Sequence, residues 1–375
     1  MVITFYGTGA ELIKMYGVIK GIPRDQQLLI CTAQQYAGLQ KVHEQLDIQP
    51  DLYLAKGWKN QDVANMKQMI GLMASVHGNF TRQFTSIKHL IRTNEKKHGT
   101  KSIVLVHGDT LTTVVGSYLG RTLGLPVAHV EAGLRSGSWK SPFPEELDRR
   151  FAAKIARVHF APNDLAEQNL RSERTKGVII NTTFNTAKDA IEQADKFVSR
   201  HYAELMLPEH YCLVLLHRTE LLESRESLEA ILKTIRTHAD AGNWVVFTMH
   251  STTAARIRSY GFDHYLEDSD HLRTIPKQAY FDFMAIVKGS DYIVTDGGGL
   301  QEDSFFLGIP VIVHRERTER QEGIGLNASI SKMNVNKVAD FLDHHPDKKE
   351  FQNLTSSVSP SKIVTDYLAA HHYVA

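Results

Sequence analysis

Short runs of apolar, mostly β-branched residues alternate with helical stretches through the first half of the chain. The apolar runs lie at 2–6, 28–31, 103–106 and 126–130. Stretches that favour helix lie at about 11–19, 61–95 and 112–123, and Pro144 opens a further helix of about a dozen residues. Gly71 and Gly78 are points at which the long helix could break. Strands that alternate with helices in this way predict right-handed βαβ units and a parallel sheet.

The same alternation then begins a second time. Further strands are predicted at 211–216, 244–248, 292–295 and 310–313, with helices at 227–239, from the glycines at 297–299 up to 307, and at 362–370. The segment 181–209 has a weak apolar period, which is typical of a linker. We therefore expect an α/β protein of two Rossmann-like, doubly wound domains, at 1–178 and 179–358. The helix within 359–375 is expected to pack back on the first domain.

Composition and charge argue against several classes of protein. The 375 residues carry a formal net charge of +1, which gives no field to attract a nucleic acid. No apolar run approaches the roughly 18 residues that a membrane span requires. Two cysteines, Cys31 and Cys212, cannot form a disulfide framework, and the adjacent histidine pairs at 344–345 and 371–372 suit a solvated surface better than a metal site. We therefore expect no bound metal. Because the chain starts with a strand and not with a leader, we also expect a cytoplasmic enzyme.

Polar residues follow directly after most of the predicted strands. Ligands of open parallel sheets bind beyond the carboxyl ends of the strands, so these positions are the candidate site. In the first half of the chain they are Thr8, His107, Asp109 and Glu131; Lys14 lies in the helix after Thr8, and Arg135 lies four residues after Glu131. In the second half they are His217, Arg218, His250 and Asp296.

Three consecutive glycines, Gly297, Gly298 and Gly299, stand between a predicted strand and a predicted helix. Glycines at a helix N-terminus let backbone N–H groups approach an anion closely, which favours a phosphate or diphosphate cradle. A tightly packed turn is the alternative. The run is neither GxGxxG nor a Walker loop, so a nucleoside triphosphatase is not predicted.

Three carboxylates form the second candidate set. Asp109 and Glu131 end strands that we expect to be neighbours, and Glu145 opens the following helix. Several acids in one cleft drive their pKa values apart, so that one can serve as an acid and another as a base. Capping or first-turn helix charges are the alternative for Asp109 and Glu145. A diphosphate could be held by His217, Arg218 and Lys14. The alternative is that His217 is a core histidine and that Arg218 and Lys14 form surface ion pairs.

Several longer motifs resemble the non-hydrolysing UDP-N-acetylglucosamine 2-epimerases. They are VHGDT at 106–110, HVEAGLR at 129–135, SPFPEE at 141–146, TDGGGLQED at 295–303, LGIPV at 307–311 and TER at 318–320. They cover most of the chain in the expected order. The resemblance implies two Rossmann-like domains with the active site in the cleft between them, as in glycosyltransferases of the B type.

The resemblance also implies a reaction and a set of roles. UDP-GlcNAc and UDP-ManNAc are interconverted without a cofactor: UDP is eliminated to leave 2-acetamidoglucal and is then added back. Asp109, Glu131 and Glu145 are then the acid/base set, with His217 and Lys14 as further active-site residues. The UDP-binding set is Arg135, Arg218, His250, Gly297, Gly298, Gly299, Glu302 and Asp303, of which Glu302 or Asp303 would take the ribose hydroxyls. A homodimer that serves surface polysaccharide synthesis is implied as well.

The chain departs from the family pattern in several motifs. The family's GTRPE is GTGAE at 7–11, so that Gly9 replaces an arginine; TGQH is TAQQ at 32–35, and HRREN is HRTEL at 217–221. Gly297 replaces a serine, and Asp303 replaces a glutamate. Regulated members bind a second UDP-GlcNAc near the altered TGQH and HRREN segments, so we expect no such activation here. Loss of an arginine–phosphate contact costs about 1.5–3 kcal/mol unless Arg135 or Arg218 replaces it.

Other functions fit parts of the same pattern. A hydrolysing relative would release ManNAc and UDP, and a related enzyme would act on another UDP-acetamido sugar. A glycosyltransferase of the same build would need an acceptor cleft but not three acids around one carbon. A nucleotide-sugar sensor would bind UDP without turnover.

Overall fold

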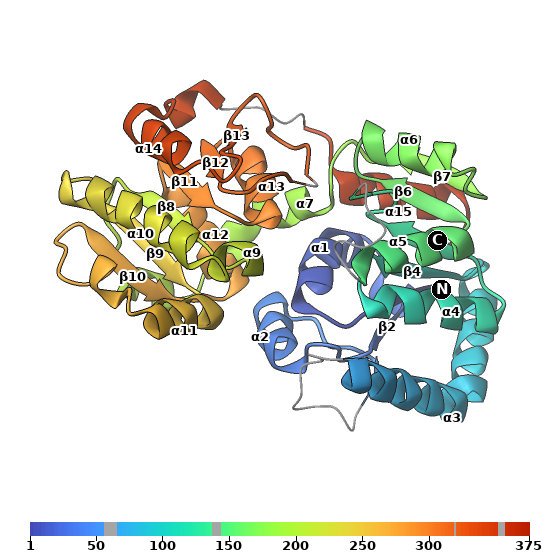
Figure 1. The fold of residues 1–375 in the computed structure, drawn as a ribbon. Coiled ribbons are helices and arrows are strands. Elements are labelled where there is room, and N and C mark those ends of the chain that lie inside the picture. The colour runs from blue at the N-terminus through green and yellow to red at the C-terminus, as the bar shows by residue number, and fades with distance from the viewer. Residues whose placement is uncertain (56–65, 137–143, 319, 352–356) are drawn as a thin grey trace. The chain divides into compact units, whose positions relative to one another are not determined.

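The computed structural model describes residues 1–55, 66–136, 144–318, 320–351 and 357–375. The predicted helix at 61–95 therefore begins outside the described residues, as do Ser141, Pro142 and Phe143 of the SPFPEE motif. The chain divides into two compact units (Figure 1): Met1–Ala190 with Val358–Ala375, and Ile191–Ser357. Each contains one parallel sheet with helices, which confirms the predicted α/β class.

The sheet of the first unit has seven strands, all parallel, in the order β3-β2-β1-β4-β5-β6-β7. The strands are β1 (Val2–Tyr6), β2 (Gln27–Cys31), β3 (Leu52–Tyr53), β4 (Ile103–His107), β5 (Val127–Val130), β6 (Val158–Ala161) and β7 (Val178–Asn181). All five residues of β1, β2 and β4 are buried. Helices on both faces of a parallel sheet bury its central strands fully, which is why these strands read as continuous apolar runs.

In the described part of the chain, the helices of the first unit include the five predicted stretches and three that were not predicted. The set is α1 (Gly9–Lys20), α2 (Tyr36–Leu46), α3 (Met66–His98), α4 (Leu111–Leu123), α5 (Glu145–Ile155), α6 (Asp164–Ser172), α7 (Ala187–Glu192) and α15 (Pro360–Ala370). Of these, α2, α6 and α7 were not predicted. Helix α3 continues through Gly71 and Gly78 without a break. Each glycine costs a helix about 1 kcal/mol, and burial of side chains such as Val76, Phe80 and Ile87 offsets that cost.

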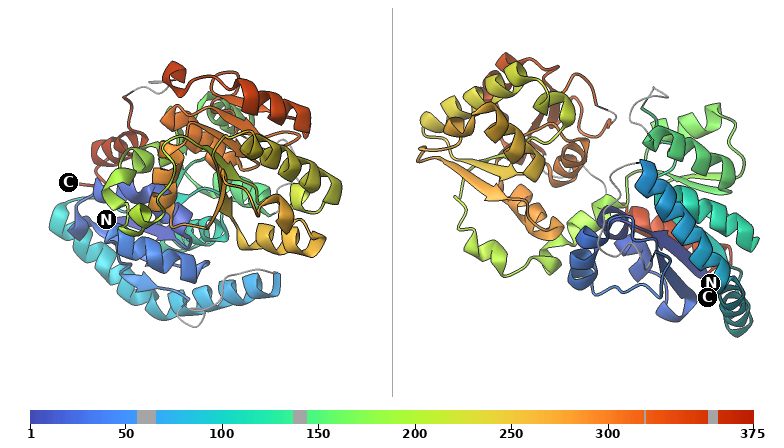
Figure 2. Two further views of the ribbon diagram at one scale, coloured as in Figure 1. Left: turned by 90° about the vertical axis from the view of Figure 1, so that its left-hand side faces the viewer. Right: turned by 60° about the horizontal axis from the view of Figure 1, so that its bottom comes forward.

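The last helix belongs to the first unit and lies against the first helix. A Cβ atom on Gly17 of α1 would come within 2.5 Å of Ser361 Oγ in α15, so only glycine permits this approach. The Ser361 N–H donates to the Asp189 carboxylate at 2.7 Å. The two chain ends lie close together (Figure 2), because Lys101 accepts from the Met1 amino group and donates its N–H to the His372 carbonyl.

The second unit has six parallel strands in the order β10-β9-β8-β11-β12-β13. They are β8 (Cys212–Leu215), β9 (Val245–Met249), β10 (Leu272–Pro276), β11 (Tyr292–Thr295), β12 (Val311–Val313) and β13 (Ala328–Ile330). Its helices are α8 (His201–Glu204), α9 (Thr219–Leu222), α10 (Arg225–Asp240), α11 (Ser251–Tyr260), α12 (Tyr280–Gly289), α13 (Gly298–Leu307) and α14 (Val335–His344). One core includes Val214 and Phe247 of the sheet and Ile231 and Ile235 of α10.

The division between the units falls within α7, inside the segment 181–209. No helix in the described part of the chain is long and apolar enough to cross a membrane. Cys31 and Cys212 are both buried free thiols in the cores of their respective units.

Candidate functional site

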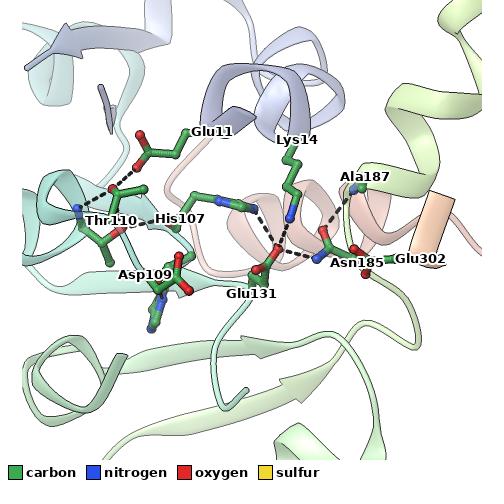
Figure 3. A network of polar contacts seen from close by, with 12 residues as sticks. Glu11, Lys14, His107, Asp109, Thr110, Glu131, Asn185, Ala187 and Glu302 are labelled. Carbon is green, nitrogen blue, oxygen red and sulfur yellow. Dashed lines mark hydrogen bonds and ion pairs between the residues drawn. The ribbon is translucent and has the colours of Figure 1, made fainter. Parts of the chain in front are cut away.

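Glu131 is the centre of a polar network in the first unit (Figure 3). One carboxylate oxygen, Oε2, accepts from Lys14 Nζ at 2.6 Å and from the Asn185 side-chain amide, and it lies 3.6 Å from His107 Nε2. The Glu131 side chain is only 5% exposed. A carboxylate buried to this extent requires such donors, because burial of an unpaired charge is costly.

The strand pairing explains why these residues meet. His107 is the last residue of β4 and Glu131 follows β5, and these two strands are neighbours, with His107 opposite Val130. The prediction that Asp109 and Glu131 end adjacent strands is therefore confirmed. Glu131 has a φ of 63°, a left-handed conformation that non-glycine residues rarely adopt. Strain of this kind gathers at functional sites, where the surrounding contacts impose it.

Asn185 was not anticipated from the sequence. Its side-chain oxygen accepts from the Ala187 N–H at 3.1 Å, which turns the amide nitrogen toward Glu131 (Figure 3). Asn185 lies 54 positions beyond Glu131, in the segment with weak apolar periodicity. No local sequence signal could have indicated this contact.

Helix α5 brings together two of the predicted carboxylates: it begins at Glu145, and Asp109 contacts one of its side chains. Arg149 of that helix donates to Asp109 Oδ2, and its other terminal nitrogen lies 3.6 Å from Glu146. Glu145 is the first residue of α5, and its Oε2 is buried without a hydrogen-bond partner in the described part of the chain. Burial, with Asp109 and Glu145 nearby, raises the pKa of Asp148 to about 7. Arg149 and Asp148 are therefore further residues of this site that sequence reasoning missed.

Arg135 is held in an ion-pair network with other residues. Its guanidinium donates twice to Glu173, at 2.9 and 2.7 Å, and also to the Leu134 carbonyl. It lies 4.0 Å from Glu146, so it reaches Asp109 only indirectly, through Glu146 and Arg149. The Arg135 side chain is 6% exposed.

Two buried groups fix the loops around these residues. The Glu11 carboxylate accepts from the N–H groups of Gly7 and Thr8 at 2.9 Å and from the Thr110 hydroxyl at 2.6 Å (Figure 3). Burial raises the pKa of Glu11 to about 7. His129 Nε2 donates to the Gly108 carbonyl at 2.7 Å, and burial lowers the pKa of His129 to about 3, so this imidazole is neutral.

In the second unit, the residues after β8 and β11 form one turn. The Asp296 carboxylate accepts from the backbone N–H groups of His217, at 2.9 and 3.0 Å, and of Arg218, at 2.9 Å. His217 Nδ1 lies 3.2 Å from Asp296 Oδ1. The His250 ring lies 5.1 Å from that of His217, and burial, with Lys277 and His217 nearby, lowers the pKa of His250 to about 4. His250 is therefore neutral at pH 7.

The triple glycine begins helix α13. Gly297 is its N-cap residue and donates its N–H to Thr295 Oγ1 at 3.0 Å. A Cβ atom on Gly297 would lie 3.0 Å from the His217 ring, which explains glycine there by packing. A Cβ on Gly299 would meet nothing within 4 Å. Packing gives no reason for glycine at that position, whereas close approach of a ligand does.

The remaining candidates lie on or beside this helix. Glu302 is almost fully buried and forms an ion pair with Arg320 at 3.2 Å, whereas Asp303 is half-buried. Arg218 lies 3.4 Å from Glu220, with 28% of its side chain exposed. A cavity of about 640 Å³ at the carboxyl ends of β9 and β10 is lined by His250, Pro276 and Lys277. A second cavity, of about 740 Å³, lies at the amino ends of β8 and β9, the end of a parallel sheet where ligands do not bind as a rule.

No group of three metal-ligating side chains occurs among the described residues. The chemistry offered is that of carboxylates, imidazoles and a helix N-terminus. The first unit holds the acids and the cations that pair with them. The second unit holds the N-terminus of α13, the partly exposed Arg218 and the neutral His250, groups that can donate hydrogen bonds to an anion.

The comparisons with known proteins agree over nearly the whole chain. The family model for UDP-N-acetylglucosamine 2-epimerase matches residues 20–360. A UDP-N-acetylglucosamine 2-epimerase of Bacillus subtilis is 33% identical over 372 residues, covering 96% of this chain and 90% of that protein.

Solved structures show the same fold. The UDP-GlcNAc 2-epimerase of Methanocaldococcus jannaschii superimposes with a TM-score of 0.78 at 24% identity, covering 98% of this chain and 99% of that one. The enzyme of Neisseria meningitidis, solved with bound UDP-GlcNAc, gives a TM-score of 0.75 at 26% identity, with coverage of 98% and 99%. The fold is thus the glycosyltransferase-B-like α/β fold that the motifs implied, and the chain belongs to the UDP-N-acetylglucosamine 2-epimerase family of isomerases.

Proposed function

We propose that this protein interconverts UDP-GlcNAc and UDP-ManNAc by elimination and re-addition of UDP. Membership of the family supports the substrate class, and the relative from Neisseria meningitidis binds UDP-GlcNAc. The observation that carries the proposal is the set of carboxylates on the first unit: Glu131 with Lys14, Asp109 with Arg149, and Glu145, whose Oε2 has no hydrogen-bond partner among the described residues.

The reaction demands such a set. A base takes the proton from C2, the electron pair forms the C1–C2 double bond, and the bond from C1 to the UDP oxygen breaks. Readdition of UDP with a proton delivered to the opposite face of C2 inverts that carbon. Two carboxyl groups must therefore act on opposite faces, and no hydride or electron leaves the sugar, so no redox cofactor is needed. Asp109, Glu131 and Glu145 are the groups that we assign to these proton transfers.

Lys14 and His217 are assigned to supporting roles at the same chemistry. Lys14 holds the Glu131 carboxylate in one orientation through its 2.6 Å contact. His217 is fixed by Asp296 and is 34% exposed, so its ring is free to donate to a phosphate or sugar oxygen. Departing UDP gathers negative charge, which a donor of this kind stabilises more strongly than it stabilises the bound substrate.

The second unit supplies groups suited to UDP. The N-terminus of α13, with Gly297, Gly298 and Gly299, would hold the phosphates, and Arg218 would contribute a cation. We favour Arg218 over Arg135 for this role because Arg135 already donates through Nε and Nη2 to both oxygens of Glu173. His250 lines the cavity beside β9 and β10, and Glu302 or Asp303 would accept from the ribose hydroxyls.

We further propose a cytoplasmic homodimer that provides ManNAc units for surface polysaccharide. The family resemblance supports this setting. Light scattering of the purified protein measures the oligomeric state: a mass twice the 42.2 kDa of the chain is expected, and a monomeric mass would contradict the dimer.

The test of the function is NMR of the purified protein with UDP-GlcNAc in deuterated water. UDP-ManNAc with deuterium at C2 is the expected product. Free ManNAc and UDP would instead identify the hydrolysing reaction. No reaction despite UDP binding would contradict the proposal and favour another UDP-sugar, a glycosyltransferase acceptor or a sensor. Asp109→Asn should abolish deuterium incorporation while UDP still binds. Asp366→Asn, which changes an exposed carboxylate on α15, is the matched control and should leave turnover unchanged.

A further inference from the structure

Asn185 reaches Glu131 from the edge of the sheet in the first unit. It follows β7, the edge strand, and β6 lies between β7 and β5 in the strand order. The chain after β7 therefore crosses the carboxyl end of β6 to bring the Asn185 amide to Glu131 Oε2 (Figure 3). Asn185 is 2% exposed, so the contact is shielded from water. A hydrogen bond to a carboxylate is stronger in such surroundings than in water.

Local hydrogen bonds fix which end of the Asn185 amide faces Glu131. The side-chain oxygen accepts from the Ala187 N–H at 3.1 Å, in the turn before α7. The oxygen is thus used, and the NH2 group is left for the carboxylate. Further along α7, the Asp189 carboxylate accepts from the Ser361 N–H at 2.7 Å and ties this helix to α15. The amide is therefore a donor held on a rigid segment.

The donor that Asn185 offers carries no charge. Lys14 of α1 already supplies a cation to Glu131 Oε2 at 2.6 Å, and His107 of β4 lies 3.6 Å from the same oxygen. Hydrogen bonds to the ionised form of a carboxyl group favour that form and fix its direction. A second cation in place of the amide would hold the charge more strongly and weaken the carboxylate as a proton acceptor. A neutral amide orients it and leaves it basic.

We propose that Asn185 is a positioning residue for the proton transfer at C2: its amide holds Glu131 as an oriented carboxylate, ready to accept a proton. The turn before α7 does not need this amide, because aspartate forms the same turn with its side-chain oxygen. The NH2 group is the part of the side chain that serves Glu131 alone. This inference rests on the proposed function, in which Glu131 transfers a proton.

Asn185→Asp separates the two roles, because aspartate keeps the acceptor for the Ala187 N–H and removes the amide donor. At low pH the new carboxyl and Glu131 share one proton. Lys14 favours its residence on the new carboxyl, which then donates to Glu131 as the amide does. When that proton is lost as pH rises, two anions face each other. The rate of deuterium incorporation relative to wild type should therefore fall by about tenfold or more between pH 5 and pH 8, while KM for UDP-GlcNAc changes by less than about threefold.

Asn334→Asp is the matched control. Asn334 is exposed at the start of α14 in the second unit, and its side-chain oxygen accepts from the Asn336 N–H at 2.9 Å, two residues on, as in the turn at Asn185. The relative rate of this control should not vary with pH. Two results for Asn185→Asp would overturn the proposal: the wild-type rate at every pH, which would leave only the turn, or an equal loss at every pH, which marks structural damage alone.

Carboxyl ¹³C titration gives a readout that needs no turnover. One midpoint of the pair in Asn185→Asp should lie above about pH 6, and the midpoint of the new carboxyl should be lower once Glu131→Gln removes its neighbour. A midpoint that does not respond to Glu131→Gln would contradict the contact. If the wild-type protein does not turn over UDP-GlcNAc, the proposed function fails while this titration still decides the contact.

Asn185→Ser covers the case in which Asn185→Asp does not fold. Its hydroxyl keeps an acceptor for the turn but is too short to replace the amide at Glu131. We expect this variant to lose about tenfold or more in kcat with KM little changed, and a wild-type kcat would overturn the proposal.

Discussion

The ion pair between Lys14 and Glu131 gives the sharpest test of how the first unit is held together. Replacement of Lys14 by Met keeps an unbranched side chain that is one atom shorter and removes its charge. Glu131 is 5% exposed, and loss of one partner of a fully buried pair costs about 3–5 kcal/mol. Lys14 is 20% exposed, and Asn185 and His107 still face the carboxylate, so we expect a smaller loss of about 2–3 kcal/mol.

The assay must separate the two units, because a protein of two units does not unfold in a single two-state step. Hydrogen exchange followed by mass spectrometry provides this separation. Peptides that contain β5 should lose protection in Lys14→Met, whereas peptides that contain β8 serve as the internal reference. Lys20→Met, which changes an exposed lysine on the same helix, is the matched control and should cost less than about 0.5 kcal/mol.

A double variant isolates the charge. Glu131→Gln leaves a neutral amide that needs no cation, so Lys14→Met should cost less in that background, with a coupling of at least about 1 kcal/mol in favour of the native pair. The reasoning is refuted if Lys14→Met costs no more than Lys20→Met, or if the two substitutions are additive.

Three further outcomes are expected. Because Glu131 has a φ of 63°, the first unit should be more stable in Glu131→Gly than in Glu131→Ala by about 1 kcal/mol, as measured by hydrogen exchange of peptides that contain β5; the reverse order would show that the backbone there is unstrained. Burial raises the pKa of Glu11 from 4.5 to about 7, so the folded protein keeps a proton that the unfolded chain releases. The stability of the first unit should fall by up to about 3 kcal/mol as pH rises from 4.5 to 7. The difference between the urea midpoints of this unit at pH 5 and pH 8, followed by hydrogen exchange of its peptides, should shrink in Glu11→Gln. Gly299→Ala should raise thermal stability slightly, because alanine favours helix, but should weaken UDP binding in calorimetry; unchanged binding would remove Gly299 from the phosphate site.

Eight of the thirteen strands in the described part of the chain were predictable, because the central strands are buried on both faces, whereas β3, β6, β7, β10 and β13 were missed. Runs such as Ile103–His107 and Val127–Val130 are apolar at nearly every position, and their alternation with helices along the chain already indicates a parallel sheet. The family was predictable from motifs that stand at the ends of those strands, since the carboxyl ends of parallel strands meet at one edge.

The partners of the site residues were much less predictable. Asp109 and Glu131 are visible at strand ends, but Arg149, Asn185 and Asp148 depend on which helix and which loop return to that edge. Asn185 comes from a segment without a clear period, and its contact with Glu131 joins residues 54 positions apart. For Arg135 the motif indicates a contact with the nucleotide, but in the folded chain its guanidinium donates to Glu173.

The return of the C-terminal helix to the first unit has a consequence for how the protein is made. The second unit is an insertion, since residues 191–357 interrupt a unit that starts at Met1 and is completed by Val358–Ala375. During synthesis from the N-terminus, the inserted unit emerges whole and can fold while the first unit still lacks α15. The helix that covers Gly17 of α1 and binds Asp189 is made only after the whole inserted unit. Loss of a few C-terminal residues, as by a premature stop codon, would therefore damage the unit that is made first and spare the one that is made second.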